Sequence, residues 1–221
     1  MNLSEVESKY KQLKDAISGR KGVPELFEYV EKLGYKTAPA SRIYHGSFNG
    51  GLLYHSVSVT ETLLRLRKVL LREEMLRHVS GESCILIGLT HDVGKLGTEG
   101  RPYYVPKWNS GYTTNENNNR PVYLDHAVRS VMIVTQFVKL KTWEVQAIVG
   151  HDGQYISANK EMAQKETPLT LLLHFADCWS AFQVEATYNI PNEEWMNEEK
   201  SDSSNRRPEG DNSGSIQSKG S

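Results

Sequence analysis

The sequence has few cysteines and no long apolar run. Its 221 residues include two cysteines, Cys84 and Cys178, both within apolar helical patterns. So few cysteines exclude a disulfide framework and indicate reduced thiols in the core of an intracellular protein. No stretch reaches the roughly 18 apolar residues of a membrane-spanning helix, and the charged N-terminus lacks the apolar segment of a signal peptide. We therefore expect a soluble, cytoplasmic protein with no membrane partner.

Neither sign of charge is in excess. The chain has 26 basic and 27 acidic residues, so its formal net charge is -1. Proteins dedicated to nucleic acids usually carry a clustered basic excess. Its absence favours a small-molecule partner over a long polyanion. The length suffices for one well-buried domain and makes a second full domain unlikely on size grounds alone.

Strand-like runs are too few to build a sheet. Apolar residues instead recur at three- and four-residue spacing, which predicts an all-α helical bundle. Ser4 followed by Glu7 indicates an N-cap with a capping box at the start of the first helix. The expected helices cover residues 4–17, 24–34, 51–77, 81–93, 124–139 and 143–151 and the segment after Pro168.

Two segments lack this periodicity. Residues 97–122 mix glycine, proline, asparagine and aromatic residues, which predicts one long irregular insertion with a hairpin turn at residues 109–111. Apolar residues nearly vanish after residue 191, a composition typical of disorder. We therefore expect one helical domain over residues 1–190 and a disordered tail over residues 191–221.

Histidines and aspartates interrupt or end several of the apolar helical stretches. Taken singly, each fits a structural role, but burying such groups without partners costs several kcal/mol. Imidazoles and carboxylates from separate helices are ordinary ligands of zinc, manganese, iron or cobalt, and helix bundles often build such sites. A shared divalent metal would satisfy the whole set. The residues are His55, His91, Asp92, His126, His151 and Asp177.

The stretch LTHDVGKLG carries the adjacent pair His91 and Asp92. Neighbours in a helix point about 100° apart, so both reach one centre only near a helix end or in a tight core, where Asp92 can bridge two ions. Gly94 suits a chain reversal behind the pair. Lys95 either directs its ammonium at a bound phosphate or is a solvated lysine favoured by the helix dipole.

The order of these residues resembles the HD-domain superfamily of metal-dependent phosphohydrolases. More narrowly, five segments are similar to the HD domain of the bacterial 3'-to-5' exoribonuclease branch, over about residues 38–186. They read YHGSFNGGLLYHSVSV, LTHDVGKL, LDHAV, VGHDGQ and TPLTLLLHFADCWSA. The resemblance implies an HD-type helical bundle whose activity depends on one or two divalent ions, which we expect to be Mn, Co, Mg, Fe or Zn.

The resemblance also assigns ligands by position. It implies that four residues bind the first metal: His55, His91, Asp92 and Asp177. It implies that His126 and His151 hold a second ion. The chain departs from the branch at Asp152, where a second successive histidine would be expected.

Other residues are candidates for substrate contacts. Asp92 and Lys95 are the expected catalytic residues, with Lys95 also on the phosphate by resemblance. Arg42, in the loop before His55, either clamps a phosphate or is a surface arginine. His45 and Asn49 share that loop and can line the pocket. His174, three residues before Asp177, is either a partner of the ligands or a core histidine.

Three functions compete. The first is hydrolysis of a nucleotide, favoured as a deoxynucleoside mono- or triphosphate, as in small phage enzymes that hydrolyse dNTPs. The second is 3'-to-5' cleavage of single-stranded RNA or DNA, and the third is a non-catalytic metal-binding module. The near-neutral charge and the lack of a segment for an oligonucleotide-binding barrel favour the first, and the intact ligand set disfavours the third.

Aromatic residues in the insertion fit the same function. They can stack on one base or pack on the domain itself. They are Tyr103, Tyr104, Trp108 and Tyr112. HD nucleotidases often assemble, so a homo-oligomer is also expected.

Overall fold

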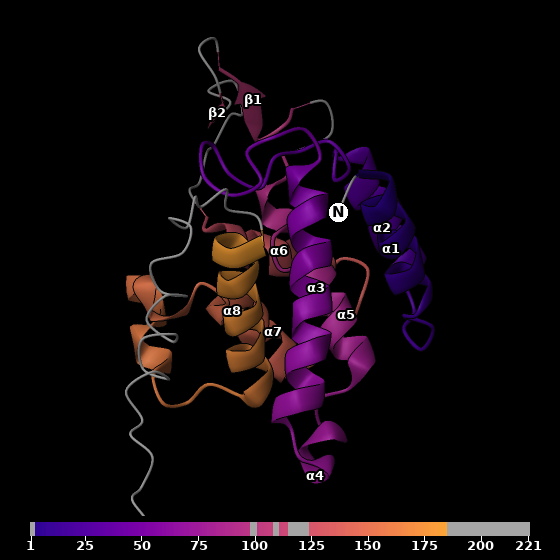
Figure 1. The fold of residues 1–221 in the computed structure, drawn as a ribbon, viewed down its shortest axis with the longest axis vertical. Helices are drawn as coiled ribbons and strands as arrows, with labels where there is room; N and C mark the ends of the chain where they lie inside the picture. The colour runs from indigo at the N-terminus through magenta and orange to yellow at the C-terminus, as the bar shows by residue number, and fades with distance from the viewer. Residues whose placement is uncertain (1–2, 98–100, 108–110, 115–123, 185–221) are drawn as a thin grey trace, which may run out of the picture. The chain divides into compact units, whose positions relative to one another are not determined.

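Helices form nearly all of the regular structure in the part of the chain that is described. The computed structural model describes residues 3–97, 101–107, 111–114 and 124–184 (Figure 1). Its α-helices are α1 (Leu3–Asp15), α2 (Val23–Lys32), α3 (Gly51–Leu70), α4 (Glu73–Leu76), α5 (Gly81–Thr90), α6 (His126–Val134), α7 (Thr142–Gly150) and α8 (Pro168–Trp179). The predicted all-α class is confirmed.

Short turns of helix complete these elements. Three are 3-10 turns: η1 (Val93–Lys95), η2 (Gly153–Tyr155) and η3 (Ser157–Met162). A π-helical turn, η4 (Ser180–Val184), follows α8.

Helix α3 lies at the centre, with α5 and α8 packed against it (Figure 1). Residues 55–60 of α3 are all buried, including small polar side chains such as Ser56 and Thr60. A helix buried on every side belongs in the interior of a bundle, and small side chains let neighbouring helices approach closely. The first turns of α3, which carry His55, therefore lie inside the domain.

The predicted helix over residues 51–77 is wrong as a single element. Helix α3 ends at Leu70, and Leu71 has an extended backbone. The Arg67 side chain explains the break, because its guanidinium donates hydrogen bonds to the carbonyls of Leu76 and Val79. These bonds fold the following segment back against the last turn of α3.

Other helix boundaries also differ from the predictions. Helix α1 includes Ser4 in its first turn, so Ser4 is not the N-cap. Helix α5 ends at Thr90, and a separate 3-10 turn follows instead of continuous helix to residue 93. Helix α6 begins only at His126, because Asp125 caps it by accepting a hydrogen bond from the backbone N–H of Ala127.

The predicted insertion contains a small hairpin. Strands β1 (Tyr104–Pro106) and β2 (Tyr112–Thr114) pair antiparallel, with Tyr104 opposite Thr114. Gly111, the last residue of the predicted turn, has φ of +70°; residues 109 and 110 lie outside the described residues, as does Trp108. The Tyr112 N–H donates to the Arg42 carbonyl at 2.8 Å, which fixes the hairpin to the loop before α3.

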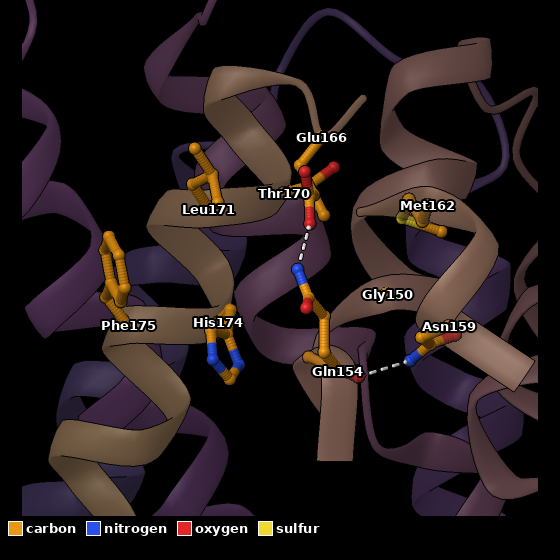
Figure 2. Close-up of a pocket in the computed structure, with 10 residues that line it drawn as sticks. Gly150, Gln154, Asn159, Met162, Glu166, Thr170, Leu171, His174 and Phe175 are labelled. Atoms are coloured by element: carbon orange, nitrogen blue, oxygen red, sulfur yellow. Dashed lines mark hydrogen bonds between the residues drawn. The ribbon is translucent and has the colours of Figure 1, made fainter. Parts of the chain in front are cut away.

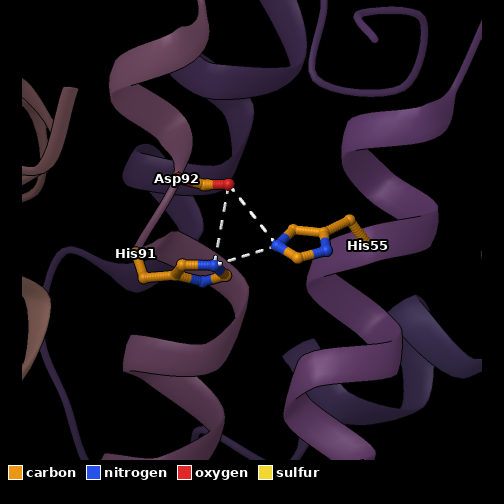
Figure 3. Close-up of side chains that lie close together, drawn as sticks. All are labelled: His55, His91 and Asp92. Atoms are coloured by element: carbon orange, nitrogen blue, oxygen red, sulfur yellow. Dashed lines mark hydrogen bonds and ion pairs between the residues drawn. The ribbon is translucent and has the colours of Figure 1, made fainter. Parts of the chain in front are cut away.

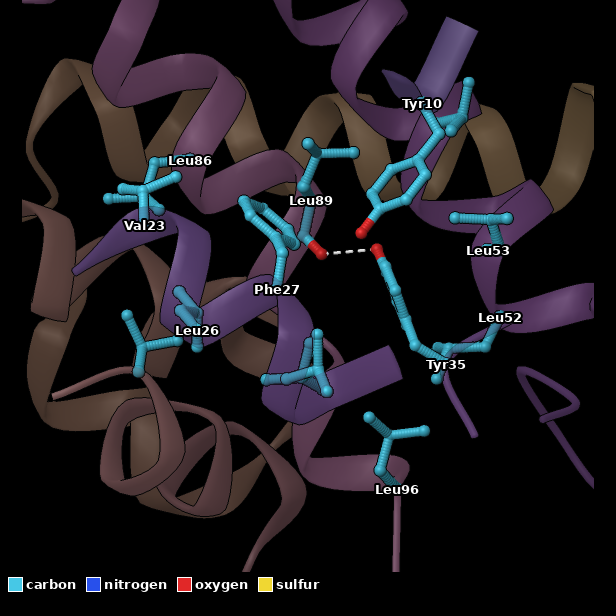
Figure 4. Packing of buried hydrophobic residues seen from close by; sticks show 14 of the residues in the cluster. Tyr10, Val23, Leu26, Phe27, Tyr35, Leu52, Leu53, Leu86, Leu89 and Leu96 are labelled. Carbon is cyan, nitrogen blue, oxygen red and sulfur yellow. Dashed lines mark hydrogen bonds between the residues drawn. The ribbon is translucent and has the colours of Figure 1, made fainter. Parts of the chain in front are cut away.

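Two apolar clusters flank helix α5. The first joins α1 and α2 to α3 and α5, and includes Phe27 and Leu89 (Figure 4). In that cluster the buried Tyr35 hydroxyl donates to the Leu89 carbonyl at 2.5 Å. The second cluster joins α5 to α7 and α8, and includes Ile87 and Leu173. Because α5 is buried from both sides, the residues that follow its last turn also lie in the interior.

The sequence also makes predictions about the C-terminal tail, the two cysteines and membrane-spanning helices. The predicted tail over residues 191–221 lies outside the described residues. Neither cysteine is in a disulfide, but only Cys84 is buried, so the prediction that Cys178 is a core residue is wrong. None of the described helices is both long and apolar enough to span a membrane.

Candidate metal centre

Helix ends bring the polar residues of the separate motifs together. His55 comes from the first turns of α3, and His126 is the first residue of α6. His91 and His151 are the C-cap residues of α5 and α7, each followed by an aspartate. Asp177 comes from α8. The structure therefore assembles every histidine and aspartate that the sequence analysis placed in the ligand set.

The first group of donor atoms, by which we mean side-chain atoms that could bind a metal ion, surrounds His55 (Figure 3). Its Nε2 lies 3.3 Å from His91 Nε2 and 3.5 Å from Asp92 Oδ2. Asp177 Oδ1 lies 3.0 Å from His55 Nε2 and 3.7 Å from His91 Nε2. His55 and His91 are fully buried, and the side chain of Asp177 is 16% exposed. His55, His91 and Asp92 therefore direct one atom each at a common point, and Asp177 contacts the two imidazoles of this group and also forms a group with His151 and Asp152.

A second group uses the other oxygen of Asp92. Asp92 Oδ1 lies 3.3 Å from His126 Nε2 and 3.5 Å from His151 Nε2. The two Nε2 atoms are 3.3 Å apart, and Asp152 Oδ2 lies 3.3 Å from His126 Nε2. Asp92 therefore belongs to both groups, with one carboxylate oxygen in each.

The donor set fits divalent cations. Ligands bonded to one ion at about 2.0–2.2 Å lie about 3.0–3.5 Å from each other, which matches most of these separations. Asp92 Oδ1 is buried and has no hydrogen-bond partner among the described residues, an arrangement that is costly unless a cation or proton compensates it. The structure thus contains a buried histidine and aspartate cluster that can hold metal; it does not select the metal.

Hydrogen bonds orient two of the imidazoles for this purpose. His91 Nδ1 lies 2.9 Å from the Gly88 carbonyl, and His151 Nδ1 lies 2.6 Å from the Ile148 carbonyl. Only a protonated Nδ1 can donate to a carbonyl, so the neutral ring presents the Nε2 lone pair to the cluster. Metal-binding histidines are commonly held by such a bond on the other ring nitrogen.

Lys95 forms part of the cluster. Its Nζ lies 2.6 Å from Asp92 Oδ2, and its side chain is 15% exposed. Burial alone lowers the pKa of Lys95, but the Asp92 carboxylate outweighs burial, and the pKa is raised. Burial raises the pKa of Asp92, whereas Lys95 and the surrounding imidazoles hold it well below its usual range. Both groups are therefore charged near neutral pH, and a solvated Lys95 is ruled out.

Two glycines, Gly88 and Gly94, allow the elements that carry the cluster to pack closely against each other. A Cβ on Gly88 would lie 2.5 Å from Thr60 Oγ1, where α5 crosses α3. A Cβ on Gly94 would lie 1.9 Å from the His126 carbonyl oxygen, and the Gly94 N–H donates to Ser130 Oγ at 2.8 Å. The Gly94 contact sets the position of α6, and so of His126, relative to Asp92.

We expect Gly94→Ala to disrupt the second donor group. Relief of the backbone clash must move α6 away from η1, at a cost of about 1–3 kcal/mol typical of overpacking. Thermal unfolding should show the destabilisation, and equilibrium dialysis should show fewer metal ions bound per chain. Gly81→Ala is the control, because nothing lies within 4 Å of the added Cβ. Unchanged stability and metal content in Gly94→Ala would contradict this role.

Metal affinity should depend on pH through His151. Burial lowers the pKa of His151, but Asp92, Asp152 and Asp177 raise it to about 9 in the metal-free protein. Because a metal must displace the Nε2 proton, affinity should rise about tenfold per pH unit from pH 6 to 8 and level off near pH 9. Calorimetric titration with Mn²⁺ in buffers of different ionisation enthalpy measures the released proton. A pH-independent affinity would contradict the prediction.

Asp152 is a donor that the sequence analysis did not assign. Its side chain is 26% exposed and contacts His126 and His151 from the outer side of the second group. The only sequence signal for this role is that Asp152 directly follows His151. The contacts place the Asp152 carboxylate beside both imidazoles of this group.

The remaining candidates lie around the cluster. The His45 ring lies 4.9 Å from the His55 ring, and the half-buried His45 is not one of the grouped donors. Arg42 and Asn49 are exposed on the same loop. His174 Nδ1 lies 2.7 Å from the His151 carbonyl oxygen. It therefore supports the backbone that carries a donor.

One cavity lies beside α8, and a second is lined by Lys95. One, of about 390 Å³, lies between α8 and the segment after α7, with His174 and Gln154 in its wall (Figure 2). The other, of about 350 Å³, lies between the end of α2 and the hairpin. Lys95 and Asn49 line the second cavity together with Tyr103, Tyr104 and Tyr112. Because Lys95 also contacts Asp92, this cavity is one side chain away from the donor atoms.

Comparison of the chain with protein-family models, curated proteins and solved structures finds no match. The resemblance to the HD-domain superfamily therefore rests on the order of the motifs and on the cluster that they form.

Proposed function

We propose that the protein is a metal-dependent phosphohydrolase that removes phosphate from a nucleotide, with deoxynucleotides as the favoured substrates. The observation that carries the proposal is the shared carboxylate. Asp92 directs one oxygen into each of two buried donor groups, and a pair of groups sharing one ligand is suited to two-metal hydrolysis of phosphoesters. A purely structural site needs only one closed group of ligands.

The residues divide into two ligand sets. His55, His91, Asp92 and Asp177 would hold one ion. Asp92 with His126, His151 and Asp152 would hold a second. A bound divalent ion supplies Lewis acidity toward a phosphate oxygen and makes water acidic enough to deprotonate near neutral pH.

Two cations of the chain are available for the phosphate. Lys95 remains protonated beside Asp92 and faces the hairpin cavity. Burial raises the pKa of the Tyr104 hydroxyl, and the positive charges of Lys95 and Arg42 oppose this rise. An incoming phosphate in the cavity would meet Lys95, and Arg42 lies in the loop that is bonded to the hairpin through the Tyr112 N–H.

His45 is suited to moving a proton. It is half-buried, its ring lies beside that of His55, and it is not needed as a donor in either group. An imidazole in this place can hold a proton for the leaving oxygen. Proton transfer by a positioned side chain typically contributes about 10²–10⁴-fold to a rate.

A nucleotide fits better than an oligonucleotide. The hairpin cavity, about 350 Å³, is at the small end of ligand pockets, which are about 300–1,000 Å³. The net charge of -1 also provides no general attraction for a polyanion. Cleavage of single strands remains the second candidate only through the likeness of the motifs to the exoribonuclease branch.

The experiment is a substrate panel. Purified protein is incubated with Mn²⁺, Co²⁺ or Mg²⁺ and with NTPs, dNTPs, NMPs, dNMPs and short RNA or DNA oligomers, and products are separated by chromatography. We expect metal-dependent release of phosphate or polyphosphate from mononucleotides, abolished by EDTA. Shortened oligomers with inert mononucleotides would replace the proposal with the exonuclease. Inactivity on the whole panel, with no metal found by elemental analysis, would favour a non-catalytic module.

A further inference from the structure

We infer that the cavity between α2 and the β1–β2 hairpin binds the nucleoside part of the substrate, with the base against its tyrosines and the phosphate directed toward Lys95. This inference rests on the proposed function for the identity of the phosphate site. It adds a specific recognition surface built from the insertion, which lies outside the donor set.

Aromatic side chains at the start of the hairpin line the cavity and are fixed by their neighbours. The Tyr103 and Tyr104 rings meet edge to face with centroids 4.8 Å apart. The Arg129 guanidinium lies 4.9 Å from the centre of the Tyr103 ring, and the same side chain donates to the Leu96 carbonyl. Tyrosines fixed in this way lose little conformational freedom when a flat ring stacks on them.

The cavity is also lined by polar groups suited to a base edge or a sugar. Asn49 has both a donor and an acceptor in its amide, and it is exposed at the cavity. Thr37 also lines the cavity, and its hydroxyl donates to the Gly34 carbonyl at 3.1 Å, which leaves oxygen lone pairs for a ligand. Aromatic faces combined with a few convergent polar groups are typical of sites for small aromatic ligands.

The position of the cavity connects it to the chemistry. Lys95 lines it and lies 2.6 Å from Asp92 Oδ2. The hairpin is also tied to the Arg42 loop by the backbone bond from Tyr112. A ligand with its flat ring on the tyrosines can therefore direct its charged end at Lys95. The cavity volume of about 350 Å³ suits one nucleoside and not a run of nucleotides.

The test separates nucleoside binding from hydrolysis. Deoxyadenosine and thymidine carry no phosphate, so their binding to EDTA-treated protein, measured by ligand-observed NMR titration, reports on the cavity alone. We expect at least one nucleoside to bind. Tyr112→Leu should weaken binding about tenfold or more, as expected for loss of one stacking ring. Tyr44→Leu is the matched control, because Tyr44 is 75% exposed outside the cavity, and it should change the Kd less than twofold.

Kinetic measurements then distinguish nucleoside binding in the cavity from hydrolysis at the metal centre. With metal restored, Tyr112→Leu should raise the KM for a mononucleotide about tenfold, whereas Tyr44→Leu should change it less than twofold. Circular dichroism confirms that the variant is folded. Nucleoside binding without any hydrolysis would support the cavity and overturn the phosphohydrolase. Nucleotide hydrolysis with no nucleoside binding, or with equal effects of Tyr112→Leu and Tyr44→Leu, would overturn the cavity assignment.

Discussion

Asp92→Asn is expected to remove the bound metal and the phosphohydrolase activity together. The substitution keeps the shape of the side chain but removes the negative charge that both donor groups share. It also leaves Lys95, which is mostly buried, without its carboxylate partner. Metal stabilisation of a phosphoryl transition state is worth several kcal/mol, so activity should fall by at least about 10³-fold. Elemental analysis should find less than a tenth of the wild-type metal.

Glu28→Gln provides the control for this prediction. Glu28 is an exposed acidic residue of α2 that pairs with Lys32 and belongs to none of the groups of possible ligand atoms. Metal content and activity should therefore stay near the wild-type values. If Asp92→Asn retained its metal and its activity, the shared-carboxylate account would be wrong. Equal losses in both variants would show that the effect is not specific to Asp92.

Arg20→Met is expected to cause a large loss of stability. The Arg20 guanidinium forms a two-point ion pair with Glu144, and the Glu144 side chain is 0% exposed. Burial raises the pKa of Glu144, and the contacts with Arg20, Ser83 and the Lys141 N–H lower it, so it is charged. Removal of one partner of a buried pair costs about 3–5 kcal/mol. For a domain of this size the melting temperature should fall by about 10 °C.

A second substitution separates the ion pair from the packing of the arginine. Glu144→Gln removes the unpaired charge but keeps an acceptor for the Lys141 N–H, which Glu144 bonds at 2.8 Å. The double variant should therefore recover part of the stability lost in Arg20→Met. Additive losses across the cycle, measured by denaturant unfolding, would show that the pair is not coupled. Because Glu144 lies in α7, whose end carries His151, weaker metal binding should accompany the loss.

Most of the donor set was predictable because of where its members lie in the sequence. His55, His91, His126 and His151 each interrupt or end an apolar helical pattern, and such a position implies a buried polar group that needs a partner. That α3 and α5 are buried helices was also predictable, because their apolar residues recur at helical spacing. Which helices meet was not derivable from periodicity and came only from the order of motifs.

The features that were missed depend on contacts between distant segments. The break after Leu70 depends on the guanidinium of Arg67 reaching carbonyls 9 and 12 residues ahead. The division of the Asp92 oxygens between two groups depends on the packing of α6 and α7. The sequence left Lys95 between a phosphate contact and a solvated lysine; the structure excludes solvation by its contact with Asp92, and the phosphate contact stays a prediction. Expectations of a homo-oligomer and of a cytoplasmic location stay predictions as well.

Anomalous diffraction from crystals grown with Mn²⁺ tests the metal centre most directly. The account predicts an anomalous peak among His55, His91, Asp92 and Asp177, and at saturating Mn²⁺ a second peak between Asp92, His126 and His151. Each peak should lie about 2.0–2.3 Å from its donor atoms. Absence of a peak next to Asp92, in crystals whose protein binds Mn²⁺ at other places or not at all, would contradict the account.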